Sequence, residues 1–255
     1  MCQKIKCVRC FYFEPIPILT STEKLDQFKP RPYWVRYCVH YFALFLGSIF
    51  TKTSISGKHN LPEKGPYILA ANHFNIFDPP FVIYAIQKPI SFLAASDTDF
   101  SFIEYLALWI YGFIPTNRSK LNPSTIKMSK KVLRENDILG IFPEGDTEHD
   151  KLRQPKSGVV YLSASASAPI IPIGVYGLDK SLWYYLFKGV RPKITINIGK
   201  SFGPYKLPKN KEEREDELVK IGDDVMCRLA ALLPSEAHGA YANNPKIEIY
   251  KKENE

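Results

Sequence analysis

Cysteine is scarce in this chain, and its spacing gives little sign of a metal site. The five cysteines are Cys2, Cys7, Cys10, Cys38 and Cys227. Cys7 and Cys10 form a single CxxC, but no second CxxC and no HxxxH follows, whereas a structural zinc ion normally takes four ligands. Residues 1–20 lack the continuous apolar stretch of a secretory signal. We therefore expect free thiols in a reducing compartment and no metal.

The sequence also lacks the common signatures of nucleic-acid binding. It has no zinc-finger spacing, no aromatic RNP-type strand and no single long basic stripe. Lys and Arg nevertheless number 34 against 26 Asp and Glu, which gives a formal charge of +8. This excess of positive charge indicates an anionic partner. Because the signatures of nucleic-acid binding are missing, we expect that partner to be an acidic membrane surface or an anionic substrate and not a nucleic acid.

No long hydrophobic run marks the first candidate helix, residues 33–50. Its uninterrupted apolar stretch, Tyr41–Leu46, is far short of the roughly twenty residues that span a bilayer. Polar and small residues fall on one narrow stripe, and nearly all other positions are apolar. We expect this helix to lie in the membrane interface with aromatic side chains at headgroup depth. A helix docked on the protein core is the alternative.

Beyond residue 53, strand-like and helix-like segments alternate. Strands are expected at 54–58, 67–71, 90–95, 138–142, 170–176 and 193–198, and helices at 81–87, 102–111, 122–135, 157–167 and 211–233. This alternation predicts an α/β domain with a mostly parallel central sheet flanked by helices. We divide the chain into a basic arm with an interfacial amphipathic helix (1–52), a single domain (53–234) and a loose polar tail (235–255).

A histidine and an aspartate follow the apolar run at 67–71. His73 and Asp78 are five positions apart, so they would lie on different faces of a helix. Asp78 and Pro79 resemble a helix start, because Asp is a favoured cap and Pro a favoured first residue. The pair would then meet across a strand-to-helix turn, where a His held by a carboxylate can act as a base. A structural His beside a capping Asp is the other reading.

Two more polar loops follow predicted strands. They are Thr116-Asn117-Arg118 and Pro143-Glu144-Gly145. Because active sites of parallel sheets lie beyond the carboxyl ends of the strands, these loops could share one site with His73.

Four short blocks, in order, resemble the pattern of the glycerolipid acyltransferases, whose best-known members are the 1-acylglycerol-3-phosphate acyltransferases. The blocks are Asn72-His73-x4-Asp78, Gly112-x-Ile-Pro-x-x-Arg118, Phe142-Pro143-Glu144-Gly145 and Ile171-Pro172-Ile173-Gly174. Each block alone is weak, but four in order at predicted strand ends are strong evidence. The likeness covers residues 54–200.

The resemblance implies acyl transfer from acyl-CoA or acyl-carrier protein to a lysophospholipid hydroxyl, on the cytoplasmic face of a membrane. His73 would be the general base and Asp78 its partner, with no acyl-enzyme, no metal and no bound cofactor. The chain has no Gly-x-Ser-x-Gly elbow. Substrate contacts would come from the remaining block residues and from a Lys-x-Gly that follows the third block: Asn72, Thr116, Asn117, Arg118, Pro143, Glu144, Gly145, Lys156 and Pro172.

One departure from the family pattern bears on the acceptor. Members that accept lysophosphatidic acid usually continue the third block with Thr-Arg-Ser, whereas this chain continues Asp146-Thr147-Glu148-His149-Asp150. An acidic run should repel a phosphate at close range. Either Arg153 and Lys156 hold the phosphate instead, or the acceptor is a zwitterionic or amino-headgroup lysolipid.

Three other readings stay open from the sequence. The first is a CoA-independent transacylase that would use the same His73 and Asp78. The second is a catalytically silent lipid-binding membrane protein, and the third is a basic membrane-surface adaptor that shares only the fold.

Overall fold

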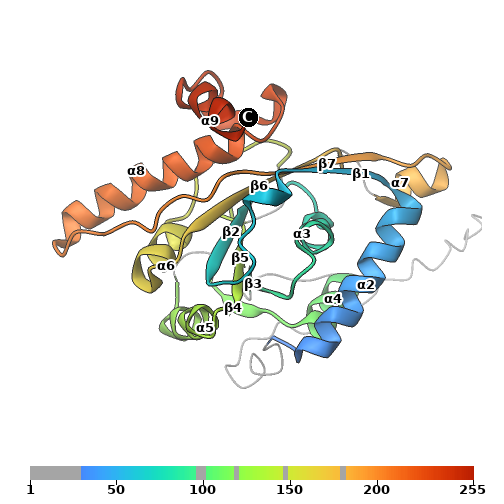
Figure 1. Ribbon diagram of the computed structural model, residues 1–255, viewed down its shortest axis with the longest axis horizontal. Coiled ribbons are helices and arrows are strands. Elements are labelled where there is room, and N and C mark those ends of the chain that lie inside the picture. Colours follow the sequence, from blue (N-terminus) through green and yellow to red (C-terminus); the bar gives the residue numbers. More distant parts are fainter. Residues whose placement is uncertain (1–29, 96–101, 118–120, 146–148, 179–181) are drawn as a thin grey trace, which may run out of the picture.

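Seven strands form one sheet in the order β1-β7-β6-β2-β5-β3-β4 (Figure 1). This is seen in a computed structural model, which describes residues 30–95, 102–117, 121–145, 149–178 and 182–255. The strands are β1 (Lys52–Ser56), β2 (Tyr67–Ala71), β3 (Ile90–Ala95), β4 (Ile114–Thr116), β5 (Ile138–Ile141), β6 (Ile170–Tyr176) and β7 (Lys193–Ile198). All neighbouring strands pair in parallel except β6 and β7. The predicted α/β fold with a mostly parallel sheet is therefore confirmed.

Helices cover both faces of the sheet. They are α2 (Tyr33–Phe50), α3 (Asp78–Ile86), α4 (Phe102–Tyr111), α5 (Pro123–Arg134), α6 (Gly158–Ala166), α7 (Leu182–Phe187), α8 (Lys211–Ala230) and α9 (Lys246–Asn254). α2, α3 and α4 lie on one side, and α5, α6 and α8 lie on the other, with α9 packed against α8 (Figure 1). Of these helices, α7 was not expected from the sequence.

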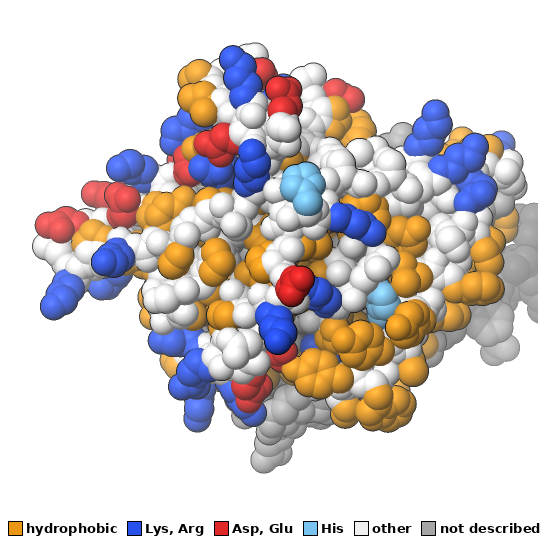
Figure 2. Space-filling model, in the orientation of Figure 1, with side chains coloured by type: hydrophobic (Ala, Val, Ile, Leu, Met, Phe, Trp, Pro, Cys, Tyr) orange, Lys and Arg blue, Asp and Glu red, His pale blue; other side chains and the backbone are white. Residues whose placement is uncertain are grey.

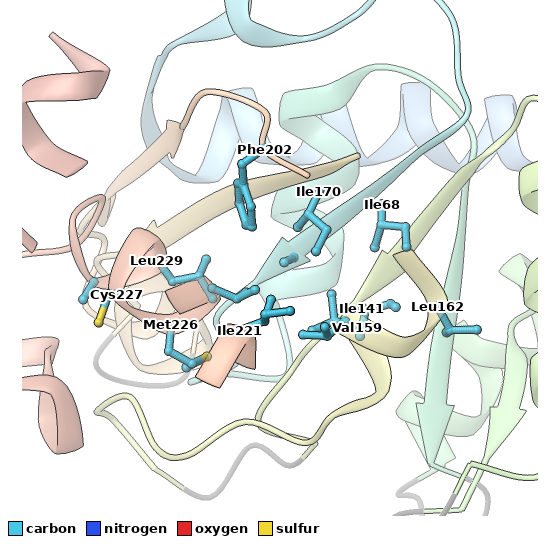
Figure 3. Close-up of a cluster of buried hydrophobic side chains, with 14 of the residues drawn as sticks. Ile68, Ile141, Val159, Leu162, Ile170, Phe202, Ile221, Met226, Cys227 and Leu229 are labelled. Carbon is cyan, nitrogen blue, oxygen red and sulfur yellow. The ribbon is translucent and has the colours of Figure 1, made fainter. Parts of the chain in front are cut away.

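β2 explains why two cores form. All five of its residues are buried, as expected for a central parallel strand covered on both faces. Side chains alternate along a strand, so Ile68 and Ala70 join the core under α6 and α8, whereas Tyr67, Leu69 and Ala71 join the core under α3. Figure 3 shows the first core, which contains Ile68 together with Val159 from α6 and Ile221 from α8.

α2 presents its polar stripe inward. Arg36 and His40 are its buried residues, and the Arg36 Nη1 donates to the Ser91 hydroxyl at 3.3 Å. A Cβ on Gly47 would lie 2.9 Å from the ring of Tyr84 on α3, so the missing side chain permits close packing there. The aromatic arc of α2 consequently faces outward.

The outward arc of α2 is strongly apolar. Trp34 is 70% exposed and Phe45 60% exposed, and Trp109 and Ile110 of α4 are also exposed beside it. Hydrophobic side chains gather over α2 and α4 in Figure 2, whereas charged side chains concentrate on α8 and α9. Among the helices of the described residues, none combines the length and hydropathy needed to cross a bilayer.

The expectation of a loose tail over 235–255 is wrong. Two short 3-10 turns and α9 fold back over α8, and Ile247 and Tyr250 are buried. Arg228 of α8 lies 4.0 Å from the ring centroid of Tyr250 and donates to the Glu253 carboxylate at 2.8 Å. Polar composition concealed this packing, because only two positions of α9 turn inward. The basic arm before residue 30 lies outside the described residues.

Candidate active site

The loops that follow β2 and β5 lie side by side. β2 pairs in parallel with β5 and β6, so the carboxyl ends of these strands share one edge of the sheet. The loop after β2 carries His73, and the loop after β5 carries Glu144 and Gly145. The topology therefore brings the first and third predicted blocks together, in the place where parallel sheets usually hold their sites.

His73 and Asp78 meet across the turn between β2 and α3. The His73 Nδ1 lies 3.3 Å from Asp78 Oδ2, and the side chains are 16% and 3% exposed. The same carboxylate oxygen accepts hydrogen bonds from the Phe74 N–H at 2.6 Å and the Asn75 N–H at 2.7 Å. Asp78 thus points back into the loop. It begins α3, with prolines in the first turn, but its carboxylate does not cap that helix.

The imidazole is held on one face by an aromatic ring. His73 and Phe142 stack with their centroids 4.1 Å apart and 24° between the ring planes. Phe92 of β3 also stacks with Phe142, with the centroids 5.8 Å apart. The contact with Phe142, which follows β5, orients the ring plane of His73, while Asp78 fixes its direction.

Glu144 joins the histidine loop to the segment that precedes α6. Its Oε1 accepts from the His73 backbone N–H at 3.1 Å, and its Oε2 accepts from the Arg153 backbone N–H at 3.2 Å. The residue is 4% exposed. A buried carboxylate with two backbone donors is a rigid bridge, so Glu144 sets the spacing between His73 and Arg153.

Gly145 allows Lys156 to approach the same loop. Its φ is +77°, and a Cβ there would lie within about 3 Å of the Lys156 side chain. The Lys156 N–H donates to the carbonyl of Pro143 at 2.8 Å, which is how the buried Pro143 contributes. An open pocket of about 440 Å³ results, lined by Glu144, Leu152, Arg153, Gln154, Lys156 and Ala240.

Asn72 and Pro172 lie in other surroundings than we expected for substrate contacts. Asn72 is fully buried, and its amide donates to the Val175 carbonyl at 2.8 Å and accepts from the Val175 N–H at 2.7 Å. Pro172 is buried within β6, opposite Ala70, with Gly199 beside its ring. Asn72 thus ties the end of β2 to the end of β6, and Pro172 packs inside the sheet. The substrate contacts expected of both residues stay predictions.

The second predicted block lies farther along the sheet. Thr116 ends β4 and Asn117 follows it; β4 is an edge strand separated from β2 by β5 and β3. They share the carboxyl edge with His73 but not its loop. Arg118 lies outside the described residues, as do Asp146, Thr147 and Glu148 of the acidic run.

Four residues of the site were not singled out from the sequence. The stacking role of Phe142 could have been noticed, because the residue belongs to the third block. Leu152, Gln154 and Ala240 line the pocket without any motif that marks them. Within the described residues, no group of three or more His, Cys, Asp or Glu side chains converges as metal ligands would.

Comparison with known proteins points to one class of enzyme. The family model described as Acyltransferase matches residues 52–176, which contain His73, Asp78, Glu144 and Lys156. A 1-acyl-sn-glycerol-3-phosphate acyltransferase of Borreliella burgdorferi is 25% identical over 202 residues, which are 78% of this chain and 78% of that protein. One of Bacillus subtilis is 26% identical over 168 residues, 63% of this chain and 79% of that protein.

A solved structure shares the fold. It is the crystal structure of a 1-acyl-sn-glycerophosphate (LPA) acyltransferase from Thermotoga maritima, with a TM-score of 0.53 and 17% identity. The match covers 81% of this chain and 83% of that chain.

Proposed function

This chain is an acyltransferase of the glycerolipid type, and from that premise we propose that it acylates the free hydroxyl of 1-acylglycerol-3-phosphate. The observation that carries the proposal is the His73–Asp78 pair, which lies beside the pocket of Glu144, Arg153 and Lys156. The curated relatives reported above are named for this acceptor. The acyl donor would be acyl-CoA or acyl-carrier protein, in phospholipid biosynthesis.

His73 would be the general base. An ionised carboxylate only accepts hydrogen bonds, so Asp78 favours the tautomer in which Nδ1 carries the proton and Nε2 is free to take one. The Nε2 would remove the proton of the lysolipid hydroxyl as its oxygen attacks the thioester carbonyl. Asp78 would then stabilise the imidazolium that forms.

The second half of the reaction returns the proton. The carbon–sulfur bond of the tetrahedral intermediate breaks, the ester remains on the lysolipid, and the imidazolium protonates the departing thiolate. Acyl transfer is direct in this scheme, because the acceptor oxygen is the nucleophile and no side chain forms a bond to the acyl group.

Arg153 and Lys156 would hold the acceptor's phosphate. Both line the pocket next to Glu144, and guanidinium and ammonium groups bind phosphate by charge-assisted hydrogen bonds. They would replace the arginine that the third block lacks. The acidic residues that follow Gly145 favour a second acceptor class, zwitterionic lysolipids, which the assay below separates from the first.

The outward arc of α2 would rest on the membrane. Its exposed aromatic residues suit the interface between headgroups and acyl chains, and α4 extends the same apolar surface. We place the enzyme on the cytoplasmic face of the membrane, as the odd number of cysteines in the sequence led us to expect.

The test is acyl transfer from a labelled long-chain acyl-CoA in detergent micelles. Wild type, His73→Ala and His59→Ala would each be offered lysophosphatidic acid and a panel of zwitterionic lysolipids. His59 is a matched control, since it is exposed and follows β1, which runs antiparallel to β2 and so ends at the opposite edge of the sheet.

We expect wild type and His59→Ala to acylate lysophosphatidic acid, and His73→Ala to lose activity by about 10³-fold or more. Preference for a zwitterionic lysolipid would overturn the proposed acceptor and make the acidic run a specificity element. Full activity of His73→Ala would overturn the proposed mechanism. Transfer from diacyl phospholipids alone would replace acyl-CoA as the donor.

A further inference from the structure

We infer that the C-terminal segment, residues 235–241, is a wall of the acceptor site and positions Arg153 for the bound lysolipid. The inference rests on the proposed function, since it concerns the acceptor of that reaction. It starts from Leu152, the residue before Arg153. The Leu152 N–H donates to the Ala237 carbonyl at 2.9 Å, and its carbonyl accepts from the Ala240 N–H at 3.0 Å.

These two hydrogen bonds leave Leu152 little freedom. Its side chain is 1% exposed in the core, so side chain and backbone are both fixed. The next peptide N–H belongs to Arg153 and binds Glu144, whose other oxygen binds the His73 N–H. The C-terminal segment is therefore one residue away from the bridge that spaces His73 and Arg153, and Ala240 itself lines the pocket.

The segment is anchored independently of the site. The His238 ring is buried and lies 3.1 Å from the Leu233 carbonyl oxygen. The Tyr241 hydroxyl donates to Asp223 of α8 at 2.7 Å. Burial raises the pKa of the Tyr241 phenol, its hydrogen bond to Asp223 adds to the rise, and the nearby Glu144 carboxylate contributes as well. The wall is thus held to α8 and lies close to Glu144.

Gly239 is the position where the contact can be broken selectively. Its φ is +51°, and a Cβ would lie 2.2 Å from the Leu152 carbonyl oxygen. Any side chain there must push the segment away from Leu152. Gly189 offers a matched control, because its φ is +62° but nothing lies within 4 Å of the Cβ position. Alanine thus strains both backbones alike, and only Gly239→Ala creates the clash.

The experiment compares wild type, Gly239→Ala and Gly189→Ala in detergent micelles. With Gly239→Ala we expect the KM for lysophosphatidic acid to rise about tenfold, as the loss of one or two backbone hydrogen bonds implies. The KM for acyl-CoA should stay within about twofold, because we assign this wall to the acceptor and not to the donor. Gly189→Ala should match wild type in both constants. A purely structural role would instead lower the fraction of active enzyme, so kcat would fall and the KM values for both substrates would stay unchanged.

A binding measurement separates this inference from the proposed function. The probe is 1-acyl-1,3-propanediol 3-phosphate, a lysolipid analogue that lacks the reacting hydroxyl, titrated by calorimetry. We expect Gly239→Ala to weaken its binding about tenfold and Gly189→Ala to leave it unchanged. No turnover of any lysolipid by wild type, with the analogue still bound, would overturn the proposed function alone. Equal binding by wild type and Gly239→Ala, or no binding by wild type, would overturn the inference.

Tyr241→Phe keeps the test decisive if Gly239→Ala does not fold. It removes only the hydroxyl that holds the segment to Asp223, and the ring remains in the core. We expect it to raise the acceptor KM about threefold with the donor KM unchanged. An unchanged acceptor KM in this variant would count against the inference.

Discussion

One carboxylate oxygen, Oδ2 of Asp78, organises the turn that carries His73. It accepts from two consecutive backbone N–H groups and lies 3.3 Å from the imidazole. The backbone bonds hold the oxygen in place whether or not the histidine changes its charge. In the proposed mechanism, such a preorganised acceptor would stabilise the imidazolium that forms without having to move.

Asp78→Asn should preserve the turn but impair the chemistry. The amide oxygen can accept from the Phe74 and Asn75 N–H groups, but it carries no charge to stabilise a protonated His73. We expect kcat to fall about 10²–10⁴-fold with a small change in KM. Steady-state kinetics with lysophosphatidic acid would measure this.

Asp216→Asn is the control for the loss of a carboxylate, because Asp216 is exposed on α8. It should retain wild-type kcat. If Asp78→Asn also did so while remaining folded, Asp78 would be structural only.

The residue types of the site could be predicted, but their surroundings could not. His73 and Asp78 stand out because their spacing and flanking prolines place them on a turn. Asn72 belongs to the same block, yet its side-chain amide hydrogen-bonds to the backbone of Val175, over a hundred positions away in the sequence. The residues around Asn72 in the sequence give no sign of such a distant partner. The sequence alone therefore does not distinguish a residue that contacts substrate from one that has a structural role.

At the scale of elements, α2 inverts the usual arrangement of an amphipathic helix. Its polar stripe is buried and its apolar arc is exposed. Burial of His40 lowers the pKa of its imidazole. A hydrogen bond with the Ile83 backbone raises the pKa again, but by less. A neutral His40 therefore suits the interface between α2 and α3.

Replacing Phe42 and Phe45 together by serine should weaken membrane binding. Both side chains are more than half exposed, so the folded protein loses little packing, whereas a lipid surface loses two buried rings. At about 25 cal/mol for each Å² of apolar area, we expect the partition coefficient to fall tenfold or more. Sedimentation with anionic phospholipid vesicles would measure it.

Val219→Ser is the matched control, since Val219 is an exposed apolar residue on α8, away from α2. Its partitioning should equal that of wild type. An equal loss in both variants would mean that α2 is not the membrane-facing element.

Hydrophobic periodicity in the sequence predicted most helices and strands, but it did not predict elements that form only through tertiary contacts. The core strands and long helices carry their own patterns and were predicted to within a few residues. α9 does not, because its inward residues are only Ile247 and Tyr250. Its helix is stabilised by docking on α8, which is a property of the folded chain.

At the scale of the whole molecule, one carboxylate of α8 holds the last helix, α9, against the rest of the fold. Asp224 of α8 accepts hydrogen bonds from the Tyr250 hydroxyl and from the Lys246 ammonium, and Arg228 lies beside it. Burial alone would raise the pKa of Asp224, but the hydrogen bonds from Tyr250 and Lys246 outweigh burial and hold it below its ordinary value of 3.8.

The depressed pKa gives the sign of a pH dependence. A carboxyl with a lower pKa in the folded state stabilises the fold above its unfolded pKa, and this stability is lost as the pH falls through the folded value. Asp224→Asn should lower the free energy of unfolding by about 1–3 kcal/mol at pH 7. The difference from wild type should be constant above pH 3.8 and should shrink as the pH falls further, through the lower pKa of the folded state.

Urea unfolding of both proteins between pH 7 and pH 3 would measure this difference. Glu215→Gln is the control, since Glu215 is exposed and pairs with the exposed Lys211 on the same helix. A constant difference between Asp224→Asn and wild type at all pH values would contradict the assigned ionisation.

The inverted α2 also predicts how this protein tolerates change over evolution. Fluid lipid demands hydrophobicity but imposes no shape, so the outward positions should exchange freely among aromatic and aliphatic residues. The inward stripe, in contrast, packs against the rest of the protein. Arg36 hydrogen-bonds to Ser91, and Gly47 leaves room for the ring of Tyr84. Saturation mutagenesis of α2 should therefore reveal a helix whose small and polar residues are fixed and whose largest residues are interchangeable.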